Sequence, residues 1–195
     1  MKKSYFIYAL LVIVVVLLAW WFATSDQAPG ILAPAPDRLV ADEAKLLAAL
    51  KQASVTIPEF NLVATLADGE ADFTDGGMVS GSIKLVSVLG QKALADGSYD
   101  VFTDMAVETG GTGTFNYVSL FHVSSDGVKN TASTFVGDRV QVQGVTVGGE
   151  LAEGGYRLSI NYLGRSLTDP MAAEPTVADS LEMRVVDHQF MGLKY

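Results

Sequence analysis

Residues 99–123 decide the class of fold: Tyr99-Asp-Val-Phe-Thr-Asp-Met-Ala-Val107, then Glu-Thr-Gly-Gly-Thr-Gly, then Thr114-Phe-Asn-Tyr-Val-Ser-Leu-Phe-His-Val123. The two outer runs are rich in β-branched and aromatic residues, which favour strands. The glycine-rich run between them is not a phosphate-binding loop, because no Gly-Lys-Ser/Thr follows it. We therefore predict two strands with a glycine-rich connection.

Similar short runs lie on both sides of this stretch. Turn signals separate them, such as Asp96-Gly97, Ser125-Asp126-Gly127 and Gly154-Gly155. Short strands at this spacing are typical of antiparallel sandwiches and barrels. We expect a mainly β domain over residues 55–195, an antiparallel sandwich or a barrel-like fold, with further strands at 60–66, 78–89, 139–147, 156–163 and 181–186.

A short amphipathic helix is predicted before this domain, at residues 37–54. Asp37 can cap its first turn, and apolar residues recur at helical spacing. They are Leu39, Val40, Leu46, Leu47 and Leu50. We expect this apolar stripe to pack on the domain; packing on a partner is the alternative.

Residues 5–23 are apolar and uncharged, and as a helix they would reach roughly 28 Å, the thickness of a bilayer core. Aromatic residues stand near both ends of this run, as they do at membrane interfaces. We therefore predict a transmembrane helix at 5–23 that binds the lipid bilayer, followed by a Pro/Ala linker at 24–36. The interfacial residues are Tyr5, Tyr8, Trp20, Trp21 and Phe22.

Lys2 and Lys3 precede the span, whereas the first charges after it are acidic. By the positive-inside rule, residues 1–4 are cytoplasmic and the rest is exported, which places the protein in the inner membrane with its C-terminal domain in the periplasm or outside. A cleaved signal peptide is the alternative. Its apolar core would be shorter, and Trp20-Trp21-Phe22 suits a cleavage site badly, so we favour a retained anchor.

The charge of the chain excludes some classes of function. It has 13 basic and 22 acidic residues, and 11 basic residues remain outside the span once Lys2 and Lys3 are set aside. This acidity argues against nucleic acid as a partner. The chain has no cysteine, which excludes disulfides and thiol chemistry.

The candidate metal ligands look sparse in the sequence. His122 and His188 are the two histidines, and a zinc site would need a carboxylate that their spacing does not indicate. Asp96, Asp100 and Asp104 hint at a calcium loop, but Lys92 and Leu94 stand where earlier ligands belong, so we favour an ordinary Asp-Gly turn. We expect no catalytic residue, cofactor or metal.

Four further motifs stand in order along the chain: Gly110-Gly-Thr-Gly-Thr-Phe115, Gly137-Asp-Arg139, Asn161-Tyr-Leu-Gly-Arg165 and Pro170-Met-Ala-Ala-Glu-Pro175. Together they resemble a family of uncharacterised bacterial exported proteins and lipoproteins. The resemblance covers about residues 92–186 and implies an exported compartment but no known reaction. This chain departs from the family at its aspartate-rich loop. The motif residues to which we assign structural roles are Gly111, Gly113, Phe115, Asp138, Arg139, Arg165, Pro170 and Pro175.

The charged motif residues suggest local contacts. Adjacent residues of a strand point to opposite faces, so we expect Asp138 and Arg139 not to pair with each other. Arg165 has five donors in a fixed fork, and we expect it to be substantially buried and to bind the proline-containing connection 167–177. An anion-binding site is the alternative role of these arginines.

The sequence predicts a membrane-anchored envelope protein that acts as a non-enzymatic interaction or accessory subunit of a larger complex, with a protein partner. The alternative is an exported hydrolase or carbohydrate-active enzyme that uses paired carboxylates such as Asp138 and Glu174. Glycoside chemistry would require the two carboxyls to line one cleft about 5 to 10 Å apart.

Overall fold

The computed structural model describes residues 36–75, 79–111, 113–166, 168–170 and 172–192, with side chains from residue 43 except that of Asp75. The chain divides into two compact units, Met1–Asp42 and Glu43–Tyr195. None of the helices in this described part is long and apolar enough to cross a membrane. The predicted span 5–23 with its aromatic residues, and the predicted linker up to residue 35, lie outside the described residues.

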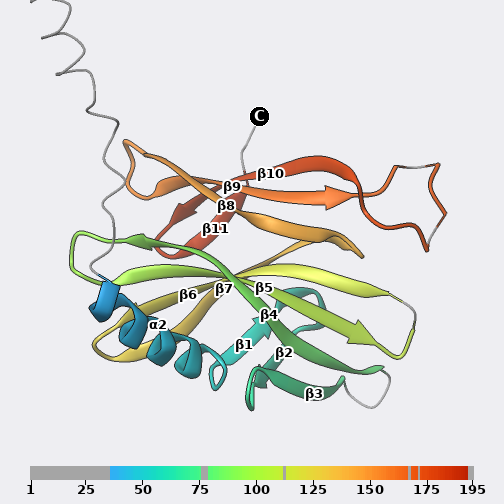
Figure 1. The fold of residues 1–195 in the computed structure, drawn as a ribbon, viewed down its shortest axis with the longest axis horizontal. Coiled ribbons are helices and arrows are strands. Elements are labelled where there is room, and N and C mark those ends of the chain that lie inside the picture. Colours follow the sequence, from blue (N-terminus) through green and yellow to red (C-terminus); the bar gives the residue numbers. More distant parts are fainter. Residues whose placement is uncertain (1–35, 76–78, 112, 167, 171, 193–195) are drawn as a thin grey trace, which may run out of the picture. The chain divides into compact units, whose positions relative to one another are not determined.

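A helix is followed by strands along the described chain (Figure 1). The elements are α2 (Pro36–Leu50), β1 (Ser54–Ile57), the 3-10 turn η1 (Pro58–Phe60), β2 (Leu62–Thr65), β3 (Glu70–Asp75), β4 (Val79–Ala93), β5 (Tyr99–Thr109), β6 (Thr114–Ser124), β7 (Gly127–Asp138), β8 (Gln141–Glu150), β9 (Tyr156–Gly164), β10 (Val177–Val186) and β11 (Gln189–Gly192).

The described strands form three antiparallel sheets, and none of them closes into a barrel. The first large sheet has the order β3-β4-β5-β6-β7, the second has the order β11-β10-β9-β8, and β1 pairs with β2. The two large sheets lie as separate layers in Figure 1. The prediction of a mainly β, antiparallel domain is confirmed.

Several element boundaries differ from the sequence prediction. The helix ends at Leu50, where Lys51 and Gln52 make a turn that leads into β1. The strand predicted at 78–89 continues to Ala93. The short strands β1, β3 and β11 and the long strand β7 were not predicted. The sequence of β7, Gly-Val-Lys-Asn-Thr-Ala-Ser-Thr-Phe-Val-Gly-Asp, is too polar to show the alternation expected of a half-buried strand.

One apolar core lies between the two large sheets. Phe102, Val118 and Leu120 of β5 and β6 meet residues of β9 and β10, and all of them are buried. Phe102 meets the ring of Tyr156 edge-on, with the ring centroids 6.4 Å apart. The residues contributed by β9 and β10 are Tyr156, Leu158, Ile160, Met183 and Val185.

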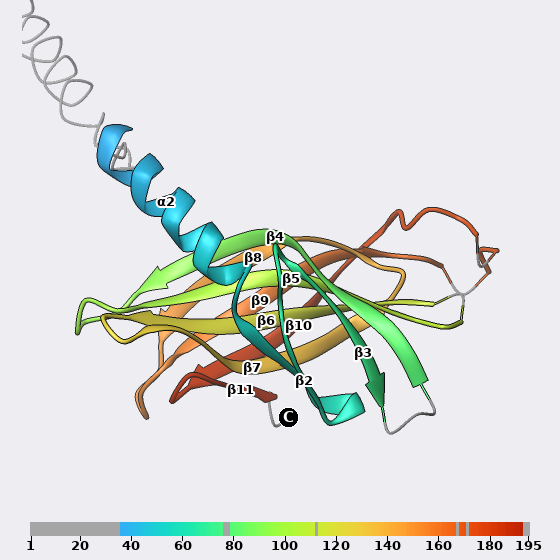
Figure 2. The same ribbon diagram turned by 90° about the horizontal axis from the view of Figure 1, so that it is seen from below.

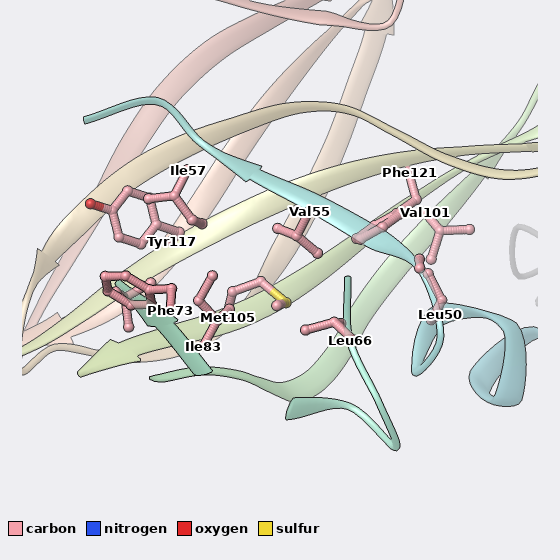
Figure 3. Close-up of a cluster of buried hydrophobic side chains, with 12 residues drawn as sticks. Leu50, Val55, Ile57, Leu66, Phe73, Ile83, Val101, Met105, Tyr117 and Phe121 are labelled. Atoms are coloured by element: carbon pink, nitrogen blue, oxygen red, sulfur yellow. The ribbon is translucent and has the colours of Figure 1, made fainter. Parts of the chain in front are cut away.

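A second core covers the opposite face of the five-stranded sheet. Here Val101 and Met105 of β5 and Tyr117 and Phe121 of β6 pack under β1 and under Leu50 at the end of α2 (Figure 3). The predicted packing of the helix on the domain holds for Leu46 and Leu50, while Leu47 is 40 % exposed. The sheet is therefore covered on both faces, and β5 and β6 at its centre are buried almost throughout.

The turn between β8 and β9 depends on a glycine. Gly155 has a φ of +84°, and a Cβ at this position would overlap the carbonyl oxygen of Val185 in β10. Gly97 has nearly the same φ, +85°, but a Cβ there would meet no heavy atom within 4 Å. An added side chain would therefore strain the backbone at both glycines, but it would clash with a neighbouring strand only at Gly155.

We expect Gly155→Ala to lower the free energy of unfolding more than Gly97→Ala does. Both substitutions cost about 1 to 2 kcal/mol for a left-handed backbone. Gly155→Ala adds a clash with β10, of about 1 to 3 kcal/mol as for other overpacked sites. Urea unfolding of both variants measures the difference, and equal losses would contradict the close approach.

Candidate functional site

The face of β5 and β6 that looks toward the second large sheet carries polar side chains among its apolar ones. Asp100 of β5 and His122 of β6 are directly opposite each other in the register of these two strands. They share this face with Phe102 and Leu120 because side chains separated by two residues point to the same side of a strand. The fold thus holds a carboxylate and an imidazole together at the edge of the core.

His188 reaches the same place from the second sheet. Val186 of β10 pairs with Gln189 of β11, so Asp187 and His188 form a two-residue turn. Their φ values are +49° and +58°, which is the backbone of the type I′ turn that suits tight hairpins. This turn brings the His188 ring to 4.0 Å from the His122 ring, measured between centroids.

Asp100, His122 and His188 together form what we call the aspartate–histidine cluster. The Oδ1 atom of Asp100 lies 2.8 Å from His188 Nδ1 and 3.3 Å from His122 Nδ1. Asp100 is 1 % exposed, whereas the imidazole side chains are 22 % exposed at His122 and 35 % exposed at His188. The cluster is therefore closed on the carboxylate side and open to solvent on the imidazole side.

The second oxygen of Asp100 is held by a phenol. The Tyr156 hydroxyl donates a hydrogen bond of 2.8 Å to Asp100 Oδ2. Burial raises the pKa of Tyr156, and the nearby Asp100 carboxylate raises it further. The phenol consequently stays protonated and remains a donor at neutral pH, and both carboxylate oxygens have partners.

This arrangement offers two kinds of chemistry. An imidazole and a carboxylate in contact can share or pass a proton. Imidazole nitrogens and a carboxylate oxygen are also common metal ligands, and the three candidate atoms lie within 4.8 Å of one another. Among the described residues, no other group of three such side chains meets this distance.

A second buried carboxyl lies farther along the same face of β5. Asp104 is 5 % exposed, and the Asn116 amide is 3.5 Å from its Oδ1. Burial raises the pKa of Asp104 to about 6, and the hydrogen bond from Asn116 offsets only part of this effect. Asp104 therefore weakens the folded state once it ionises.

The aspartates weighed as a calcium loop do not converge. Asp96 is exposed, and its Oδ1 accepts bonds from the backbone amide and the hydroxyl of Ser98, which lowers the pKa of Asp96. A backbone bond from Gly97 to Leu94 closes the turn. This geometry is that of the ordinary Asp-Gly turn, while Asp100 belongs to the aspartate–histidine cluster.

Four of the family-motif residues meet at one end of the five-stranded sheet. Phe115 is opposite Asp138 in the register of β6 and β7, and a Cβ at Gly113 would lie 3.1 Å from the Phe115 ring and 3.3 Å from Asp138 Oδ1. The backbone amide of Arg139 donates to Thr114 O at 2.7 Å. Gly113 thus gives the space that Phe115 and Asp138 need. Gly111 is exposed in the adjoining turn.

The expectation that Asp138 and Arg139 do not pair is wrong. Arg139 Nε lies 3.8 Å from Asp138 Oδ1. Arg139 has a φ of +53° and ends the strand, so the alternation of side chains that separates neighbours in a strand does not apply.

The remaining motif residues lie in or next to the connection between β9 and β10. Arg165 and Pro175 are partly buried, and Pro170 is exposed. Backbone bonds from Ala173 to Pro170 and from Thr176 to Gly164, each 2.9 Å, brace this connection. The binding of this connection by Arg165 stays a prediction. Glu174 is exposed here, and no described contact joins it to Asp138, its predicted partner in an enzyme site.

Two of the three residues of the aspartate–histidine cluster, Asp100 and His122, could have been paired from the sequence. If the predicted strands 99–107 and 114–123 pair about their glycine-rich connection, Asp100 falls opposite His122, so the missing carboxylate could have been found. No local signal marks His188 or Tyr156 as neighbours, because they come from another sheet.

Comparisons with protein-family models, with curated proteins and with solved structures found no match for this chain.

We expect Tyr156→Phe to lower the free energy of unfolding by about 1 to 3 kcal/mol, because it removes a donor from a buried carboxylate while keeping the ring. Tyr162→Phe is the matched control, since Tyr162 donates to the exposed Asp179 at 3.0 Å, and it should cost less than about 0.5 kcal/mol. Urea unfolding measures both values. Equal losses would show that the buried hydrogen bond stabilises the protein no more than the exposed one does.

We expect Asp104→Asn to stabilise the protein at neutral pH. The folded-state pKa of about 6 lies above the ordinary value of 3.8, so the folded state binds the extra proton between these values and stability falls as the pH rises through them. At pH 7 the variant should gain on the order of 1 to 3 kcal/mol, and at pH 4 little. Urea unfolding at both pH values measures the gain in the free energy of unfolding, and Asp126→Asn at an exposed turn is the control. A gain that is the same at both pH values would contradict the raised pKa of Asp104.

Proposed function

We propose that this protein is a membrane-anchored protein of the inner membrane and cell envelope, and that its exported domain is a non-enzymatic interaction or accessory subunit. The apolar run 5–23 and the basic residues before it support the anchor and its orientation. The described domain adds one observation that supports an interaction role, which is that β4 and β8 both have an uncharged edge.

The first of these edges is the outer side of β8. Among the described strands, β8 is the last of its sheet and pairs with β9 alone. Its residues from Gln141 to Gly149 contain no charge and no proline. Soluble proteins usually place charges, prolines or a covering element on such edges, because free backbone donors and acceptors recruit other strands.

The second edge belongs to β4. In the described register β3 covers β4 only up to Lys84, and Val86 and Val88 beyond that point are 51 % and 42 % exposed. The run from Leu85 to Gln91 is also uncharged. Here the sheet therefore presents apolar side chains next to backbone groups that no described strand covers.

These two edges meet. A Cβ at Gly90 of β4 would lie 3.2 Å from Val145 of β8, and Lys92 Nζ is 3.7 Å from Glu150 at one end of the pair. We call residues 85–91 of β4 and 141–149 of β8 the β4–β8 edge (Figure 2). An extended segment of a partner can add to such an edge through main-chain hydrogen bonds, with its apolar side chains against the valines.

The test compares the wild type with Val86→Lys/Val88→Lys after purification from membranes in mild detergent. The protein that copurifies with the wild type should be absent from the double lysine variant, because lysine at a strand edge opposes strand addition. Val63→Lys on β2, where Val63 is 67 % exposed, is the matched control and should keep that protein.

Three results would contradict the proposal. They are a wild type that purifies as a clean monomer, an edge variant that keeps the partner, and an intact mass that shows loss of residues 5–23. Exposed positions should change stability by about 0.5 kcal/mol at most, so thermal melts of all three proteins should agree.

A further inference from the structure

The aspartate–histidine cluster is the feature that the interaction role leaves unexplained. Burying a carboxylate is unfavourable unless the protein satisfies it fully, yet this chain buries Asp100 and places both of its histidines on one oxygen. Two imidazoles that converge on the same carboxylate oxygen are also the arrangement from which a metal ion takes its ligands.

The distances suit a small divalent ion. Tetrahedral zinc binds nitrogen and oxygen at about 2.0 to 2.2 Å, which sets neighbouring ligand atoms roughly 3.3 Å apart. His122 Nδ1 is 3.3 Å from Asp100 Oδ1, and His188 Nδ1 is 2.8 Å from it. His188 would need to move away by about half an ångström to reach that spacing. It stands on a two-residue turn at the end of a hairpin, so this movement disturbs no strand.

The surroundings supply what a metal site requires beyond its ligands. The Tyr156 hydroxyl holds Asp100 Oδ2, so the carboxylate is oriented and Oδ1 is left for the ion. Such outer partners tune metal affinity. The imidazoles are partly exposed, so the ion can reach the site from solvent, and solvent can supply the fourth ligand.

We propose that Asp100 Oδ1, His122 Nδ1 and His188 Nδ1 bind one divalent transition-metal ion, and that zinc is the ion this ligand set fits best. Imidazole ligands favour zinc and its neighbours in the first row over magnesium and calcium, which prefer oxygen. The ion would join β5 and β6 of one sheet to the β10–β11 turn of the other. This proposal does not depend on the β4–β8 edge.

The experiment uses the full-length protein in mild detergent, purified with a tag that contains no histidine and treated with a chelator. Calorimetric titration with Zn²⁺ should show one ion per chain, and Mg²⁺ should show no binding. Zn²⁺ should also raise the melting temperature, because the ion binds the folded state. Since His122 and His188 are the two histidines of the chain, imidazole signals in NMR spectra report on this cluster alone, and both should shift with Zn²⁺.

The variants separate this site from binding by surface carboxylates. His188→Asn removes the imidazole but keeps a residue that tolerates the left-handed turn, and His122→Gln removes the other imidazole. Tyr156→Phe keeps all three ligands and should weaken zinc about 10- to 100-fold, and each histidine variant should weaken it more. Asp179→Asn, at an exposed carboxylate, should bind zinc as the wild type does.

Three outcomes would overturn the proposal: no stoichiometric Zn²⁺ binding by the wild type, unchanged imidazole signals on addition of Zn²⁺, or undiminished binding by His188→Asn. The NMR result needs no variant, so it decides the question even if a substitution prevents folding. Zinc that binds without moving the imidazole signals would be held by surface carboxylates only.

Discussion

The pairing of β5 with β6 is the constraint on which the rest of the domain depends. Its register puts Tyr99 opposite Val123 and Glu108 opposite Thr114. Because side chains alternate along a strand, a slip of one residue would exchange the two faces of this sheet. The face with Phe102 and Leu120 would then lose its contact with β9 and β10, and the face with Val101 and Phe121 would lose its contact with β1 and α2.

The same register decides where the polar groups are buried. Asp100 and Asp104 share a face with Phe102, so the packing that buries the phenylalanine also buries both carboxyls. The two differ in how they are satisfied. Asp100 has partners on both oxygens, from both sheets, whereas Asp104 faces one amide at 3.5 Å. A buried charge without full compensation is destabilising, and burial accordingly raises the pKa of Asp104 from its ordinary value of 3.8 to about 6.

The domain therefore combines two sites with different physical origins. The β4–β8 edge arises where uncharged runs of β4 and β8 end their sheets side by side, and we propose it as a site for a protein segment. The aspartate–histidine cluster arises where the two sheets are joined by polar side chains, and it is suited to an ion. The first site consists of backbone groups that no described strand covers, and the second consists of side chains that the fold brings together.

The sequence by itself determined the class of fold and most of the long strands, because β-branched and aromatic residues between Asp-Gly and Gly-Gly turns leave few alternatives. It also contained the Asp100–His122 pair, which follows from two neighbouring strands that pair directly. It did not reveal β7, whose polar residues show no period, or the ion pair of Asp138 with Arg139, which depends on a left-handed residue at a strand end. Only the tertiary structure brought His188 and Tyr156 to Asp100, from 88 and 56 residues away in the chain. The physical reason is that contacts between sheets are set by which faces pack together and by the geometry of a distant turn, and neither leaves a local pattern in the sequence.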